Sequence, residues 1–132
     1  MLKVKLSLDP KDRITFTRAV TIPTPDGTPL KITFDFRYRD RQQMAELLDG
    51  YIDKARASAA AASDPGRTIA STVEEAIKND IEAVRDIATG WNVDGHAFDE
   101  ETLETFFRMY PGAPLAIVSD YRVSLTEGRL GN

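Results

Sequence analysis

The chain has 132 residues, with 17 Lys and Arg against 21 Asp and Glu, a formal net charge of −4, and no cysteine. A chain of this length can bury a core of its own, and the lack of cysteine excludes disulfide frameworks, cysteine zinc sites and thiol nucleophiles, while the single histidine excludes multi-histidine metal sites. With no apolar run near the roughly 18 residues of a membrane helix and no signal-peptide pattern, we expect one domain over residues 1–132, located in the cytoplasm.

The charge is distributed unevenly along the chain. Residues 1–66 carry 11 basic and 9 acidic groups, whereas residues 67–132 carry 6 basic and 12 acidic ones. Binding to nucleic acid needs clustered Lys and Arg, and the densest basic run, residues 37–41, is interrupted by Asp40. We therefore expect no nucleic-acid partner.

Apolar and polar residues alternate through the first forty positions. The apolar members occupy even positions in three segments: Leu2, Val4, Leu6, Leu8, then Ile14, Phe16, Val20, Ile22, then Leu30, Ile32, Phe34, Phe36. A period of two indicates strands with one buried and one solvated face, and turn residues separate the segments. Residues 1–39 are thus predicted to form a three-stranded antiparallel β-meander.

From Asp40 onward the apolar period becomes helical, which predicts about four helices and an α+β fold. The first helix covers residues 40–62, with Asp40 and Gln43 as its capping box and residues 44–55 covering the sheet. The second covers residues 69–89 and is expected to start at a capping box made by Ser71 and Glu74. A mobile loop at residues 59–68 separates these two helices, since its small and polar residues bury little.

The C-terminal part, residues 91–132, is predicted to hold two short helices. The first is capped by Asp99, with Phe98 contacting Leu103 across the cap, and it ends at Pro111. The last helix ends at Gly128.

The densest acidic cluster lies beside the single histidine. It consists of Asp94, Asp99, Glu100, Glu101 and Glu104, close to His96. The spacing does not match a calcium loop, and acidic residues are favoured in the first turn of any helix. Because no serine or cysteine lies in a nucleophile-like context, we expect no metal, no cofactor and no catalytic site.

Aromatic residues are concentrated in the C-terminal third. We assign Trp91, Phe98, Leu103 and Phe106 as structural anchors between the helices. The two short helices carry more apolar surface than they can bury against each other, which predicts a docking surface for a partner helix within residues 99–125. The residues assigned to that surface are Phe107, Tyr110, Tyr121 and Leu125.

The order of these features resembles a known family. Residues 14–20 and 33–39 are similar to the N-terminal sheet of the small tail assembly chaperones of long-tailed bacteriophages and prophages. The C-terminal third resembles that family more closely, in the order Gly90-Trp91, Phe98, Leu103, Tyr110-Pro111, Ala116-Ile117, Tyr121 and the tail of residues 127–132. The chain departs from the family pattern in a short loop after Trp91 and in Gly131, where a basic residue is expected.

The resemblance implies a non-enzymatic chaperone that acts during viral tail assembly. Such proteins bind the long, apolar tape measure protein, keep it soluble, and help recruit tail tube subunits. In many phages a longer form made by ribosomal frameshifting carries the extension that recruits those subunits.

Two alternatives from other classes remain open at this point. An adaptor or regulatory module would bind a partner by β-strand addition at a sheet edge formed by residues 2–8. The charges of Lys3 and Lys5 would protect that edge against unwanted pairing. A small hydrolase would be centred on His96.

Overall fold

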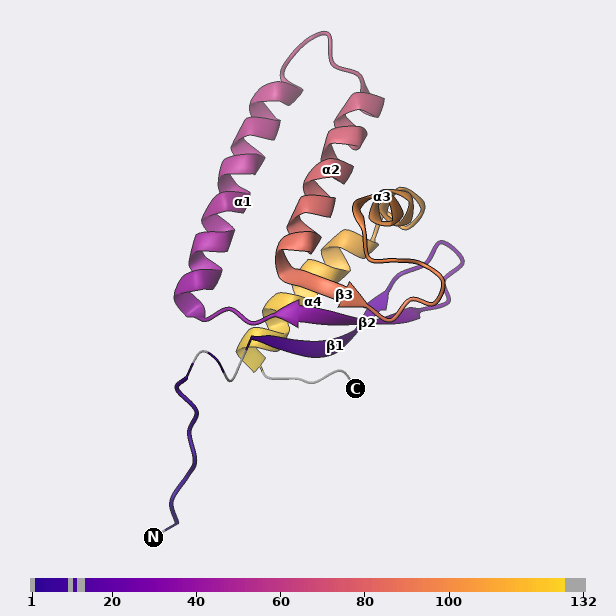
Figure 1. Ribbon diagram of the computed structural model, residues 1–132. Helices are drawn as coiled ribbons and strands as arrows, with labels where there is room; N and C mark the ends of the chain where they lie inside the picture. Colours follow the sequence, from indigo (N-terminus) through magenta and orange to yellow (C-terminus); the bar gives the residue numbers. More distant parts are fainter. Residues whose placement is uncertain (1, 10, 12–13, 128–132) are drawn as a thin grey trace.

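The computed structural model describes residues 2–9, 11 and 14–127. Along the chain the elements are β1 (Thr15–Ile22), β2 (Leu30–Arg37), α1 (Arg41–Ala62), α2 (Ile69–Ile87), β3 (Ala88–Trp91), α3 (Glu100–Met109) and α4 (Ala113–Glu127). The strands form one antiparallel sheet in the order β1-β2-β3, and the helices lie on one side of it (Figure 1). The predicted α+β class, with a three-stranded antiparallel sheet and four helices in the described residues, is confirmed.

The β1–β2 hairpin follows the alternation in the sequence. Its register runs from Thr15 opposite Arg37 to Ile22 opposite Leu30. The apolar row is fully buried on the helix-covered face and consists of Val20, Ile22, Ile32, Phe34 and Phe36. This is the pattern expected of a sheet with one buried and one solvated face.

The identity of the third strand differs from the prediction. Residues 2–8 form no strand, and Leu2, Val4, Leu6 and Leu8 are 72–97% exposed. Instead, residues predicted to end the second helix form β3, which pairs antiparallel with β2. The reason is that α2 runs directly into β3 and carries Ala88 onto the core, where it is 1% exposed. Alternation predicts a strand, but it does not identify its pairing partner.

Helices α1 and α2 form an antiparallel pair that rises from the sheet (Figure 1). The predicted capping box of α1 is confirmed, since the Asp40 side chain accepts from the Gln43 N–H and the Gln43 side chain accepts from the Asp40 N–H. None of the side chains of α1 is fully buried, and this helix packs against α2. Of residues 44–55, which were predicted to cover the sheet, Met44 and Leu47 pack against the core, whereas the helices that contact the strands are α2 and α4.

The start of α2 lies three residues earlier than its predicted capping box. Thr68 is the N-cap, and its side chain accepts from the N–H of Ser71 while the Ser71 hydroxyl accepts from the N–H of Thr68. The loop before it is also shorter than expected, since α1 continues through Ala62. Arg67 bridges this loop to α2 by hydrogen-bonding Thr72 and pairing with Glu75.

Helices α3 and α4, the last two elements of the chain, contribute buried side chains to the core. The predicted Asp99 cap is confirmed, with its carboxylate 2.8 Å from the Thr102 nitrogen, and α3 ends at Met109, before Pro111. Besides the sheet residues, the buried apolar core contains Ile81, Val84, Ile87, Ala88, Leu103, Phe107, Ala113, Ile117 and Tyr121. The predicted helix stop at Gly128 lies outside the described residues.

Candidate partner-binding groove

Two of the four predicted partner contacts lie in the core. Phe107 is 3% exposed and Tyr121 is fully buried. The Tyr121 ring packs against Phe36 with centroids 5.1 Å apart, and its hydroxyl donates to the Arg37 carbonyl at 2.7 Å. These two residues cannot contact a partner in this fold, and their assignment to the docking surface is corrected for that reason.

The four predicted anchors lie together between the sheet and α3. Leu103 is fully buried, whereas Trp91, Phe98 and Phe106 are partly buried against the core. The Trp91 ring makes edge contacts with both phenylalanines, with centroids 5.5 Å from Phe98 and 5.6 Å from Phe106. Edge-to-face aromatic pairs of this kind stabilise one packing arrangement beyond simple area burial. Trp91 therefore fixes the position of α3 relative to β3.

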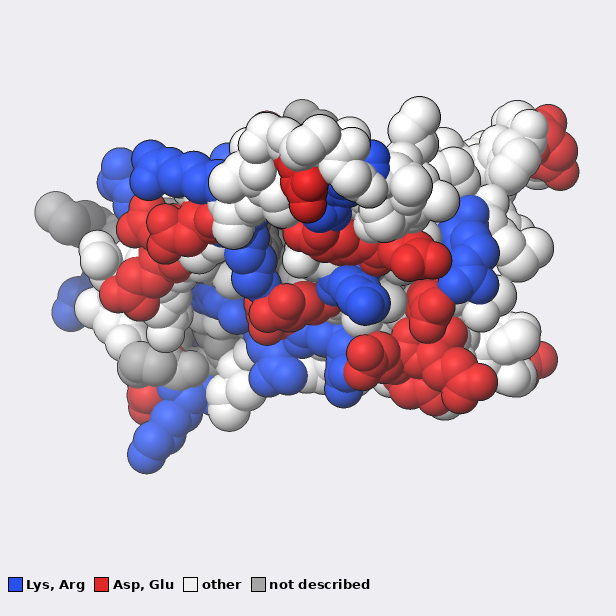
Figure 2. Space-filling model, turned by 90° about the horizontal axis from the view of Figure 1, so that it is seen from above, with Lys and Arg blue, Asp and Glu red and all other residues white. Residues whose placement is uncertain are grey.

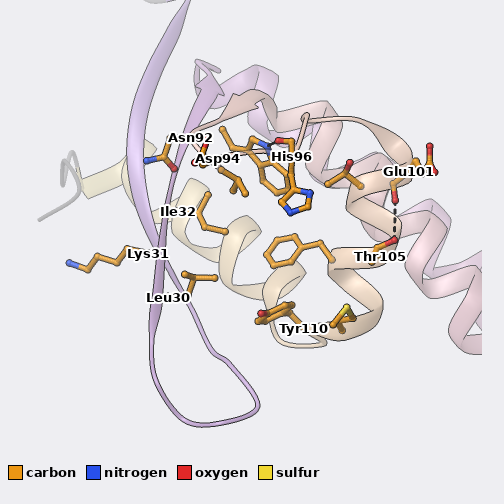
Figure 3. A pocket seen from close by; sticks show the side chains of 14 residues that line it. Leu30, Lys31, Ile32, Asn92, Asp94, His96, Glu101, Thr105 and Tyr110 are labelled. Atoms are coloured by element: carbon orange, nitrogen blue, oxygen red, sulfur yellow. Dashed lines mark hydrogen bonds between the residues drawn. The ribbon is translucent and has the colours of Figure 1, made fainter.

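An open groove lies where this aromatic cluster reaches the surface, between the start of β2 and α3. We call it the aromatic groove. It has a volume of about 810 Å³. Its apolar lining consists of Leu30, Ile32, Trp91, Val93, Phe106, Met109 and Tyr110. Figure 3 shows Leu30 and Ile32 pointing from β2 toward the aromatic side chains, while Lys31 points away.

The loop between β3 and α3 forms the upper wall of the groove and is held at both ends. The Asn92 side chain accepts from the Thr33 N–H at 2.8 Å, and the Asn92 N–H donates to the Thr33 carbonyl at 3.0 Å. The Trp91 indole nitrogen donates to the His96 carbonyl at 2.9 Å. Gly95 has φ 77°, a backbone conformation that favours glycine. The groove is thus largely preformed by bonds within the chain.

The rim of the groove is acidic on the α3 side. The backbone N–H of Thr102 bonds the Asp99 carboxylate and lowers the pKa of that group, as expected at a helix N-terminus. Glu101 and Asp94 line the groove itself. Seen from above, acidic side chains gather on the side of the molecule where α3 lies (Figure 2). The groove therefore combines an apolar floor with a negatively charged rim.

The described residues do not form a metal site at the groove. No group of three or more His, Asp or Glu among them is placed to hold a metal ion. A second hollow, of about 650 Å³ between α2 and β3, is lined by charges of both signs, including Arg85 and Glu82.

In the described part of the chain, no helix combines the length and the apolar character that crossing a bilayer requires.

Sequence reasoning identified part of the groove and missed the rest. Tyr110 was predicted and lines it, whereas Leu125 is partly buried on α4 and does not. Leu30, Ile32 and Met109 were missed. Met109 follows Phe106 by three positions, which is the spacing of one helix face, and this signal pointed to it. Nothing in the sequence indicated that β2 would lie opposite α3.

The fold and the groove define a small α+β protein with an open, largely apolar groove on its surface. A family model described as phage tail assembly chaperone matches residues 1–132, and the chain belongs to that family. No curated protein and no solved structure matches the chain.

Proposed function

We propose that this chaperone binds the tape measure protein through the aromatic groove and keeps it soluble before the tail tube forms. Membership of the tail assembly chaperone family supports a protein partner in tail assembly. The observation that supports the groove as the site is the exposed apolar surface at its lip, where Met109 is 61% and Leu30 is 39% exposed. The proposal also includes recruitment of tail tube subunits, action in the bacterial host cytoplasm, and no catalysed reaction.

The groove suits an amphipathic helix. A helix presents apolar side chains at positions i, i+3, i+4 and i+7, and these can insert between Phe106, Met109 and Tyr110 on one side and Leu30 on the other. A few aromatic side chains at the centre of such a site usually dominate the binding energy. The acidic rim remains in water and keeps the complex soluble.

The test is co-expression with a tape measure protein from the same phage or prophage genome. Met109→Asp places a charge at the lip of the groove, at a side chain that is 61% exposed and lies outside the buried core. The matched control is Leu115→Asp, since Leu115 is 73% exposed on α4 and lies outside the groove. We expect the wild type and Leu115→Asp to keep the tape measure protein soluble and Met109→Asp to lose this effect.

Trp91 provides a direct readout of binding, because it is the single tryptophan and lines the groove. Filling the groove should shift its emission to shorter wavelength and reduce its quenching by iodide. If Met109→Asp still solubilises the tape measure protein, the site lies elsewhere. If the wild type does not bind that protein, the proposed partner is wrong.

A further inference from the structure

In the part of the chain that the structure describes, the outer edge of β1 is an unpaired strand edge eight residues long. In an antiparallel pair, residues alternate between bonding the neighbouring strand and pointing away from it. Because the Ile14 carbonyl accepts from the Tyr38 N–H, the even-numbered residues of β1 bond β2. The backbone groups of Thr15, Thr17, Ala19 and Thr21 therefore point outward, and within residues 2–9, 11 and 14–127 no other strand pairs with them.

This edge lacks the usual protection against pairing with another chain. Natural edges are blunted by exposed charges, prolines or bulges. The outward-facing positions of β1 carry only threonine and alanine, and its pairing with β2 is regular. Its one charged side chain, Arg18, is turned toward α4 and neutralised by Asp120 at 2.6 Å.

The chain also contains a segment with the pattern of a strand and no place in the sheet. Residues 2–8, here called the N-terminal arm, alternate apolar side chains with Lys3, Lys5 and Ser7. Its apolar side chains are 72–97% exposed, and the arm extends away from the body of the molecule (Figure 1). An apolar row this exposed is typical of surface that another chain covers.

The arm and the β1 edge match in length and in their alternating pattern. Paired with β1, the arm would extend the sheet by one strand, with Leu2, Val4, Leu6 and Leu8 on the helix-covered face beside α4. Lys3 and Lys5 would then lie on the solvated face beside the threonines of β1, where no like charge opposes them.

We propose that two copies of this chain form a dimer by exchanging their N-terminal arms, each arm adding a strand to the β1 edge of the other copy. The described arm lies away from its own sheet (Figure 1), which leaves its apolar side chains exposed to a neighbouring molecule. Each copy has one arm and one edge, so a two-fold dimer satisfies both and closes the assembly. The proposal is independent of the aromatic groove, to which the arm and the outward-facing positions of β1 contribute no lining residue.

The mass of the full chain in solution, measured by sedimentation over a range of concentrations, tests the proposal. Val4→Asp places a charge on the apolar face of the arm. Ile69→Asp is the matched control, because Val4 is 90% and Ile69 is 85% exposed, and both side chains are β-branched. We expect the wild type and Ile69→Asp to dimerise, and Val4→Asp to weaken the dimer by at least about tenfold.

A second variant addresses the edge itself. Thr17→Pro removes a backbone N–H that points outward and leaves the bonds between β1 and β2 in place, which circular dichroism can check. It should be monomeric. Mixed with Val4→Asp, it should form a heterodimer through its intact arm and the intact edge of the other variant. Met109→Asp should dimerise normally, which separates this test from that of the proposed function.

The opposite results overturn the proposal. They are a wild type that stays monomeric at high concentration, or a dimer that persists in both Val4→Asp and Thr17→Pro. A monomer in which hydrogen exchange shows the amide of Thr17 to be protected by its own arm would replace arm exchange by an intramolecular fourth strand.

Discussion

The Tyr121 hydroxyl on α4 donates a 2.7 Å hydrogen bond to the Arg37 carbonyl at the end of β2. The same hydroxyl accepts from the Arg39 guanidinium at 3.0 Å, and Arg39 also donates to the Asp86 carbonyl at the end of α2. One buried phenol therefore connects the sheet, α2 and α4. Burial raises the pKa of Tyr121, so the hydroxyl keeps its proton.

Tyr121→Phe should lower the free energy of unfolding by about 1–3 kcal/mol, because it leaves the carbonyl of Arg37 without this donor. Urea unfolding should show a lower midpoint with an unchanged slope. Tyr110→Phe is the control, since its ring lies at the groove, and it should change the midpoint little. An equal effect of both substitutions would contradict the structural role of the Tyr121 hydroxyl.

Gly112→Ala should destabilise the protein by about 1–3 kcal/mol, the usual cost of overpacking. A Cβ atom at Gly112 would lie 2.7 Å from Cγ of Pro23, a ring that cannot move aside easily. Gly50→Ala is the matched control, because a Cβ atom there meets nothing within 4 Å inside exposed helix α1. That substitution should stabilise the protein by about 0.5–1 kcal/mol. Thermal unfolding of the two variants should shift in opposite directions.

Thr68→Ala should cost about 1 kcal/mol through loss of the N-cap of α2. Ser71→Ala should cost less, because the cap acceptor remains in place. Had the helix started at a cap made by Ser71, as the sequence pattern alone suggested, the order would be reversed. Chemical denaturation of the two variants decides between these starts.

Stability should fall at alkaline pH. Burial, followed by the charge of Asp86, raises the pKa of Tyr51 from 10.0 to about 12. Between these values the unfolded chain has lost a proton that the folded protein keeps, so the stabilisation is complete below pH 10 and is lost as the pH rises toward 12. Tyr51→Phe should reduce this slope. A pH profile identical to that of the wild type would show that Tyr51 titrates normally.

The sequence by itself determined the elements whose signals are local. Alternation placed β1 and β2, and the capping residues Asp40 and Asp99 placed the starts of α1 and α3. These signals depend on the backbone and on neighbouring residues, which the sequence contains in full. Trp91 was predicted to lie between helices, and the structure places it instead at the end of β3, packed against Phe34 and Phe106.

Only the tertiary structure decided which surfaces cover one another. The apolar periods of α3 and α4 predict buried stripes, but the same pattern fits a core and a docking face, so Phe107 on α3 and Tyr121 on α4 were assigned to the wrong one. The third strand is β3 rather than residues 2–8, because α2 carries Ala88 onto the core. The aromatic groove exists because Leu30 and Met109, 79 positions apart in the sequence, line the same hollow. Whether a side chain is buried depends on both of the surfaces that pack together. The spacing of apolar residues along the sequence describes only one of those surfaces.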